Sequence, residues 1–243
     1  MSQSLQVHIW SDIACPWCYV GKRRFERALE GFARADDVQI TWRAFELDPS
    51  APRVRPPQPY AERLAAKYGR SQAEAQQMID RMAETARGDG IAMDFEHAQP
   101  GNTFDAHRLL HLALDRGLQD ALKERLFRGY LCEGRSIGDP ATLLALATEV
   151  GLSADEVTAV LETDQYAQEV RADQAQARAY GISGVPYFVL DNRFAVEGAQ
   201  PTTLLLTALE RAFADRPQLI GAASVAEGAV CGPDGCEVDV PTP

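Results

Sequence analysis

Strand-like segments lie at two distant places in this chain, and an almost entirely helical stretch separates them. Residues 5–10 and 38–47 alternate apolar and polar side chains, with a helical pattern between them. Strand patterns return only at 185–191 and 193–198, after a block at 60–180 in which helical patterns follow one another. A strand, a helix and a strand in succession favour parallel pairing in an α/β fold. The sequence therefore predicts one sheet whose two halves are separated by a helical insertion.

A proline-rich segment and the return of the strands set the predicted domain boundaries. Residues 49–59, PSAPRVRPPQP, exclude a helix, because proline lacks the backbone N–H and clashes within a helical turn. We expect a discontinuous α/β domain formed by residues 1–47 and 170–215. A helical insertion domain is expected at 48–169, and a C-terminal extension at 216–243.

Charge and hydropathy exclude two classes of partner. The net charge of −11 argues against nucleic acid and anionic lipid, because phosphate binding needs a local positive excess. No segment approaches the roughly 18 to 20 consecutive apolar residues of a membrane span. The first residues lack the basic and apolar regions of an export signal. We therefore expect a globular cytoplasmic protein that binds neither nucleic acid nor membrane.

Two of the five cysteines, Cys15 and Cys18, flank a Pro-Trp pair directly after the first predicted strand. Pro16 suits the first position of a helix, which places Cys15 at the N-cap. Free N–H groups and the positive end of the helix dipole stabilise an anion there, so the pKa of Cys15 should fall below the usual value of about 8.5. Cys18, one turn later, begins the apolar stripe and should be partly buried and less acidic. This asymmetry predicts that Cys15 attacks a substrate disulfide and that Cys18 resolves the mixed disulfide.

The same pair has two other interpretations. A structural zinc site needs four ligands, and His8, His97, His107 and His111 lack the spacing of a finger or ribbon, so no metal is expected. Two inert core thiols are the second interpretation. The strand before the pair, the intervening proline and an exposed type of residue at Trp17 argue against it, since redox C-x-x-C pairs are expected near a βαβ pattern.

Three segments in order resemble a known family. They are SDIACPWCYVGKRRFERAL (11–29), NTFDAHRLLHLA (102–113) and GISGVPYFVLDNRFAVEGAQP (181–201). They resemble the DsbA branch of the thioredoxin superfamily, and within it the FrnE-type proteins, which are cytoplasmic relatives with thiol oxidoreductase or isomerase activity. The resemblance implies a thioredoxin fold interrupted by a large all-helical insertion domain. It also implies a protein disulfide oxidoreductase or isomerase that needs no cofactor.

The resemblance also implies how a substrate is bound. Val185-Pro186 should form the family's cis-proline loop beside Cys15, with Val185 offering backbone groups to an extended substrate. Pro16 and Trp17 should border the reactive thiol as an apolar rim. We expect loose substrate choice without a dedicated pocket. The expected partners are thiol- or disulfide-containing proteins, with glutathione or a thioredoxin-like protein as the candidate reductant.

Two departures from the family pattern concern the chemistry. Pro16-Trp17 supplies no side-chain donor to the thiolate, unlike sites with a histidine between the cysteines, so a less oxidising couple than that of DsbA is expected. Ile9 occupies the place where thioredoxin-like strands often carry a buried acid, and the nearest carboxylate is Asp12. Asp12 either assists proton transfer or caps the turn.

Two alternatives from other functional classes stay open. Chromene-carboxylate isomerases and kappa-class glutathione transferases share the inserted helical domain and use glutathione. They typically carry serine at the position of Cys15, so two cysteines favour exchange chemistry. Asn102, Thr103 and His107 either line a pocket facing Cys15 or cap and pack a helix. A redox sensor without turnover is the second alternative.

A second cysteine pair lies near the C-terminus. Cys231 and Cys236 flank Gly-Pro-Asp-Gly, which suits a tight turn that places the two cysteines opposite each other. This C-x4-C resembles one found in some FrnE-type proteins and implies an auxiliary redox pair; a static clip or a loose tail are the other interpretations. Cys132 stands alone and is expected to be a small buried apolar residue.

Overall fold

A computed structural model describes residues 4–54, 58–216, 231–232 and 235–236, the last two pairs as backbone only. The elements follow in the order β1 (Leu5–Ser11), α1 (Pro16–Glu30), a short 3-10 turn (Ala35–Asp37), β2 (Val38–Ala44), α2 (Tyr60–Tyr68), α3 (Gln72–Gly88), α4 (Phe104–Asp115), α5 (Gln119–Cys132), α6 (Pro140–Glu149), α7 (Ala154–Glu162), α8 (Ala167–Ala179), β3 (Tyr187–Leu190), β4 (Phe194–Glu197), α9 (Thr202–Ala214), β5 (Cys231–Gly232) and β6 (Gly235–Cys236).

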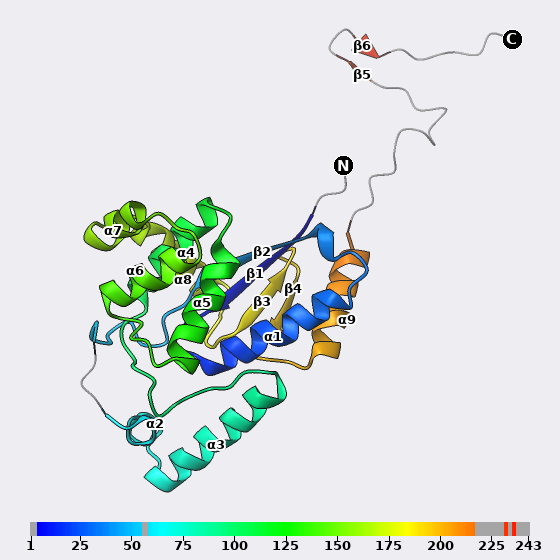
Figure 1. The fold of residues 1–243 in the computed structure, drawn as a ribbon. Helices are drawn as coiled ribbons and strands as arrows, with labels where there is room; N and C mark the ends of the chain where they lie inside the picture. Colours follow the sequence, from blue (N-terminus) through cyan, green and yellow to red (C-terminus); the bar gives the residue numbers. More distant parts are fainter. Residues whose placement is uncertain (1–3, 55–57, 217–230, 233–234, 237–243) are drawn as a thin grey trace, which may run out of the picture. The chain divides into compact units, whose positions relative to one another are not determined.

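The first four strands form one sheet in the order β2-β1-β3-β4 (Figure 1). β1 pairs with β2 in parallel and with β3 antiparallel, so Val7 lies between Ile40 and Leu190. β3 and β4 form a hairpin whose turn residues, Asp191 and Asn192, both have positive φ. The two halves of the sheet are thus far apart in sequence, and the predicted α/β thioredoxin fold with a helical insertion is confirmed.

Different helices cover the two faces of the sheet. On one face, Val7 and Ile9 pack with Phe25 of α1 and Leu209 of α9, all nearly or fully buried. On the other face, Trp10 packs near α8, and its indole N–H donates to the backbone oxygen of Asp173 at 3.0 Å. The alternation of β1 therefore anchors α1 on one side, which fixes the start of that helix at the end of β1.

Helices α2–α8 lie between β2 and β3 in sequence, and Figure 1 shows α4–α8 gathered beside the β2 edge. Their core includes Leu122, Leu126 and Phe127 of α5, and it also takes in Tyr19 of α1, which stacks on Phe127. The side chain of Gln119 bonds to both the N–H and the C=O of Trp42 on β2, at 2.9 and 3.0 Å. The insertion is therefore locked to the first turns of α1 and to the sheet edge.

The chain forms two compact units, Met1–Phe213 and Ala214–Pro243. In the second unit, Cys231 pairs with Cys236 and Gly232 with Gly235 in a short antiparallel ladder, as the predicted turn requires. The side chains of the two cysteines lie outside the described residues. The division of the first unit into an α/β domain and a helical domain, with boundaries at residues 48 and 170, stays a prediction. In the described part of the chain, no helix combines the length and apolar character needed to cross a membrane.

Candidate active site

Cys15 is the N-cap residue of α1, and Pro16 is the first residue of the helix, as predicted. The Cys15 backbone is extended, with φ −95° and ψ 111°, and its N–H donates to the Asp12 carbonyl at 3.1 Å. Its side chain accepts no capping hydrogen bond of the kind that a serine or threonine hydroxyl forms at an N-cap. The thiol is 6% exposed, so it is reached through the pocket described below.

The pKa of Cys15 is lowered from the ordinary value for a thiol. A hydrogen bond from the Cys18 side chain is the main cause, and it outweighs burial, which raises the pKa. The backbone N–H groups of Cys18 and Trp17 lower it further, whereas the Asp12 carboxylate opposes them. The donors that stabilise a Cys15 thiolate are therefore the Cys18 thiol and the backbone N–H groups of Trp17 and Cys18, all in the first turn of α1.

Cys18 has the opposite character. It is fully buried, where the sequence suggests only partial burial, because it lies in the core that the helical insertion forms with the first turns of α1. Burial raises the pKa of the Cys18 thiol well above its usual value, and the Cys15 side chain raises it further. The Ser11 hydroxyl and the Lys123 ammonium act in the other direction. One acidic and one weakly acidic thiol thus lie side by side.

The loop before β3 lies against Cys15. The Val185-Pro186 peptide bond is cis, and the Cys15 thiol donates to the Val185 carbonyl at 3.6 Å. Gly21 of α1 allows this loop to come close, since a Cβ at that position would lie 2.8 Å from Cγ of Pro186. The structure therefore brings Val185 and Pro186 to the place that the sequence predicts for them.

Asp12 is buried in the turn between β1 and α1. Its carboxylate accepts from the N–H of Leu47 at 2.8 Å and of Ala14 at 3.3 Å, and His107 Nε2 lies 3.5 Å from Oδ1. Burial raises the pKa of Asp12, but His107 and these N–H groups outweigh it, and the net shift is downward. Asp12 therefore stays ionised and holds the turn; the buried His107 packs beneath it.

Asn102 and Thr103 lie at the start of α4. Thr103, not Asn102, is the N-cap residue, and the Asn102 side chain instead accepts from the N–H of Phe104 at 2.8 Å. Its amide also donates to the carbonyls of Pro49 and Ala51. Thr103 lines the pocket beside Cys15, whereas Asn102 and His107 do not. Of the three, only Thr103 lies in contact with the space in front of the thiol.

A pocket of about 600 Å³ opens at Cys15, where the sequence does not lead us to expect a dedicated substrate pocket. Trp17, with its side chain 43% exposed, forms part of its rim, as predicted. Aromatic side chains from the insertion also line it, among them Tyr60 and Phe95, whose ring centres are 4.8 Å apart. This aromatic wall is formed by residues far from Cys15 in sequence, so no local pattern around the cysteines signals it.

Sequence reasoning also missed Lys123, which lies behind Cys18. It is fully buried on α5, and its ammonium donates to the carbonyl of Ser11 at 3.4 Å. Lys123 is three residues before Leu126 and four before Phe127, both buried in the core. A lysine on the same helical face as these buried apolar residues is unusual, and this pattern is the sequence feature that could have indicated it.

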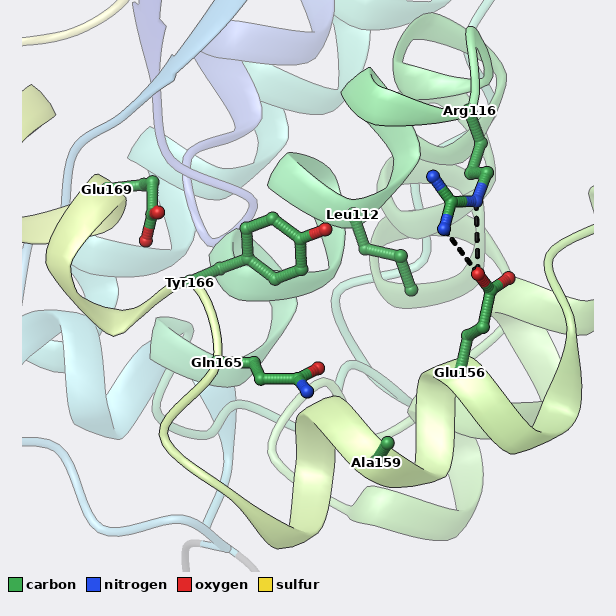
Figure 2. A pocket seen from close by; sticks show the side chains of 7 residues that line it. All are labelled: Leu112, Arg116, Glu156, Ala159, Gln165, Tyr166 and Glu169. Atoms are coloured by element: carbon green, nitrogen blue, oxygen red, sulfur yellow. Dashed lines mark hydrogen bonds and ion pairs between the residues drawn. The ribbon is translucent and has the colours of Figure 1, made fainter.

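A second pocket, of about 480 Å³, contains no cysteine (Figure 2). Figure 2 shows Arg116 and Glu156 on one side of it, joined by two hydrogen bonds at 3.1 and 2.5 Å. Tyr166 and Gln165 lie across from them. The charged groups of Arg116 and Glu156 neutralise each other, and Glu169 adds a further carboxylate to the lining of this pocket.

Comparisons with known proteins agree with this geometry. Residues 6–210 match the family described as DSBA-like thioredoxin domain. The chain is 31% identical over 193 residues to the uncharacterized protein YwbO of Bacillus subtilis, which covers 77% of this chain and 87% of that protein.

Solved structures show the same fold. A probable DsbA oxidoreductase from Streptomyces coelicolor is 45% identical, with a TM-score of 0.83 over 97% of this chain and 100% of that chain. The cytosolic disulfide reductase DsbM from Pseudomonas aeruginosa shares the fold at 18% identity, with a TM-score of 0.57 over 86% of this chain and 98% of that chain.

Proposed function

Because this chain belongs to the family of DSBA-like thioredoxin domains, we propose that it exchanges protein disulfides through Cys15 and Cys18, as a thiol:disulfide oxidoreductase with isomerase activity. The observation that carries this proposal is the opposite shift of two adjacent thiols. The pKa of Cys15 is lowered by donors at the start of α1, and that of Cys18 is raised by burial. Such a pair provides one nucleophile and one resolving group.

The reaction proceeds by two successive displacements at sulfur. The Cys15 thiolate attacks one sulfur of a substrate disulfide, forming a mixed disulfide and releasing the other sulfur as a thiolate. Cys18 then loses its proton and attacks Cys15, which forms the Cys15–Cys18 bond and releases the reduced substrate. In the reverse direction the same steps oxidise a dithiol. Isomerisation occurs when the substrate's own thiol, rather than Cys18, attacks the mixed disulfide.

Substrate binding is assigned to the groups around Cys15. The Val185 carbonyl, 3.6 Å from the thiol, and the neighbouring Pro186 would align an extended backbone across the reactive sulfur. Trp17 and the aromatic wall of the pocket would bind apolar side chains next to the substrate cysteine. Such contacts are nonspecific, which suits an enzyme that acts on many unfolded or partly folded proteins.

Replacing Cys18 with serine should trap the first intermediate. Cys15 would still attack, but no neighbouring thiol could resolve the product, so covalent adducts should accumulate on incubation with a disulfide-containing protein. Intact-mass measurement and nonreducing electrophoresis would detect them. Cys132→Ser is the matched control, because that cysteine is partly buried and its pKa is raised to about 11. A Cys18→Ser protein that forms no adducts would contradict the assignment.

The finer assignment is a FrnE-type protein of the cytoplasm, reduced by glutathione or a thioredoxin-like protein. The motif segments at 11–29, 102–113 and 181–201 support it. The alternative of a glutathione-dependent isomerase or transferase is less favoured, because a resolving cysteine would divert the bound glutathione into exchange. Saturable turnover of a small aromatic substrate with glutathione, persisting in Cys18→Ser, would favour that alternative instead.

We also propose that Cys231 and Cys236 form an auxiliary redox pair that exchanges electrons with Cys15 and Cys18. Support comes from the ladder that pairs the two residues. Replacing both with serine should therefore slow refolding of a scrambled disulfide protein at saturating substrate. Alkylation of Cys15 should be unchanged, which separates this effect from damage to the main site. Unchanged refolding turnover would remove the proposal.

A further inference from the structure

A buried lysine lies behind the active thiols and is not used by the mechanism above. Lys123 is fully buried, and its ammonium donates to the carbonyl of Ser11 at 3.4 Å. The nitrogen also lies 5.4 Å from the ring centre of Trp42 and 4.9 Å from that of Phe127. A carbonyl and two aromatic faces support a cation only weakly, so the amine is held where its charge is costly.

A neighbouring buried lysine, Lys22, has the carboxylate partners that Lys123 lacks. Lys22 lies over the same Trp42 ring and pairs with Glu26, Asp120 and Glu124. Lys123, by contrast, forms no ion pair with any residue in the described part of the chain. The Lys123 ammonium therefore lacks a permanent carboxylate partner. A nearby group that carries a negative charge in only one of its protonation states is the remaining candidate.

The groups that face Lys123 identify this counterpart. Cys18 on α1 is the strongest source of stabilisation for its charge, followed by Asp12 and Cys15 in the preceding turn, whereas Lys22 on α1 opposes it. Asp12 is already held by two backbone N–H groups and by His107. The buried Ser11 hydroxyl favours the Cys18 thiolate by a hydrogen bond, and Lys123 favours it through its charge.

We propose that Lys123 is the proton acceptor for Cys18: its Nζ takes up the proton that Cys18 gives up when it resolves the mixed disulfide. This inference rests on the proposed exchange function and deepens it. It assigns a proton acceptor to a thiol that would otherwise have to lose its proton inside the core. This role of Lys123 in the resolving step is separate from that of the hydrogen-bond donors at Cys15, which favour the attack of Cys15 on the substrate disulfide.

The step balances as follows in atoms and electrons. With Cys15 joined to the substrate sulfur, the Cys18 proton passes to the neutral Lys123 amine. The Cys18 sulfur attacks Cys15, their S–S bond forms, and the bond from Cys15 to the substrate breaks. The electron pair leaves on the substrate thiolate, which is protonated by water; the substrate is reduced and the cysteine pair oxidised. While the pair is oxidised, the amine gives the proton up to solvent; when a dithiol or glutathione reductant later opens the pair, Cys18 leaves as a thiolate and is protonated again by way of Lys123.

The acid–base properties of the two groups suit this exchange. Burial lowers the pKa of Lys123 to about 8, so a fraction of the amine is neutral near pH 7. Burial raises the pKa of Cys18, and the Lys123 charge draws it back. Once a disulfide removes the thiolates, the support that they give to the ammonium is lost and the neutral amine is favoured. Proton and electron transfer are thereby coupled at one buried site.

The test separates the two steps with the aromatic disulfide 5,5′-dithiobis(2-nitrobenzoate). The reduced protein should release one coloured thiolate in a reagent-dependent phase, from attack by Cys15. A second release should follow in a reagent-independent phase, when Cys18 attacks. In Lys123→Met the first phase should change little. The second should slow by at least about tenfold at pH 7, less than the roughly 10²- to 10⁴-fold typical of a general base because only a fraction of the amine is neutral there. Its rate should keep rising with pH after that of the parent has levelled off near pH 8.

Control variants make the result decisive. Lys22→Met removes a buried lysine at the same ring and should leave the second phase within about twofold of the parent. Lys123→Arg keeps a charge that does not dissociate near neutral pH and should stay slow. A parental second phase in Lys123→Met, or one restored by Lys123→Arg, would overturn the proton-holding role. Absence of the first phase in the parent would instead overturn the proposed function itself.

Discussion

Replacing Cys15 with serine should reduce disulfide exchange to the uncatalysed background. A serine hydroxyl is not ionised at neutral pH and cannot form a mixed disulfide, so no other group at the start of α1 replaces the nucleophile. The assay is refolding of a scrambled disulfide protein, together with the first phase of the aromatic disulfide reaction. Both should be lost, while Cys132→Ser keeps both.

The pH dependence of Cys15 gives the same prediction a second measurement. Its pKa is lowered in the folded protein, so the thiolate persists as the pH falls below the usual titration range of cysteine. The rate of alkylation by iodoacetamide should therefore begin to fall at a lower pH than it does for an ordinary cysteine. Residual exchange in Cys15→Ser equal to that of the parent, or alkylation that follows an ordinary thiol, would refute Cys15 as the nucleophile.

Local sequence was sufficient for the features that depend on neighbouring residues. The cap at Cys15 follows from Pro16, because proline fits the first helical position and the residue before it is held extended. The turn at Asp191 and Asn192 follows from residues that tolerate positive φ between two strand patterns. The parallel pairing of β1 with β2 follows from the helix between them.

The parts that could not be predicted depend on contacts between distant segments. The pocket beside Cys15 exists because Tyr60 and Phe95, from the insertion, line the same space as the start of α1. Lys123 is more than a hundred residues from Ser11 in the sequence, and only the packing of α5 against β2 and α1 brings them together. Periodicity identifies which face of a helix is buried, but not what that face meets.

Lys123 also bears on the expected redox poise. The lack of a side-chain donor between the two cysteines predicts a couple that is less oxidising than that of DsbA. A buried cation acts in the opposite direction, because it stabilises thiolates and therefore the reduced state. The helical insertion thus supplies, from behind Cys18, electrostatic support that the Pro16-Trp17 segment does not.

The same lysine should cost the protein stability, and Lys123→Met should recover it. The pKa of Lys123 is about 8 in the folded chain against 10.5 for a free lysine. Between those values the unfolded chain binds more protons, so the cost is fully present below pH 8 and disappears as the pH rises to 10.5. The difference corresponds to about 3 kcal/mol, and methionine fills nearly the same volume without a charge. Chemical denaturation of the reduced protein at pH 7 should show that gain.

Lys22→Met and Lys123→Met should change the free energy of unfolding in opposite directions. Lys22 has a raised pKa because Asp120 and Glu26 outweigh its burial, so its removal should lower the free energy of unfolding. Lys123→Met should raise it and should also abolish the increase in stability that the parent shows between pH 8 and 10.5. A loss of stability in Lys123→Met, or an unchanged increase over that pH interval, would mean that burial does not disfavour the charged form of the Lys123 amine. A stabilised variant with slow resolution would show that the fold gives up stability at Lys123 to give Cys18 a proton acceptor.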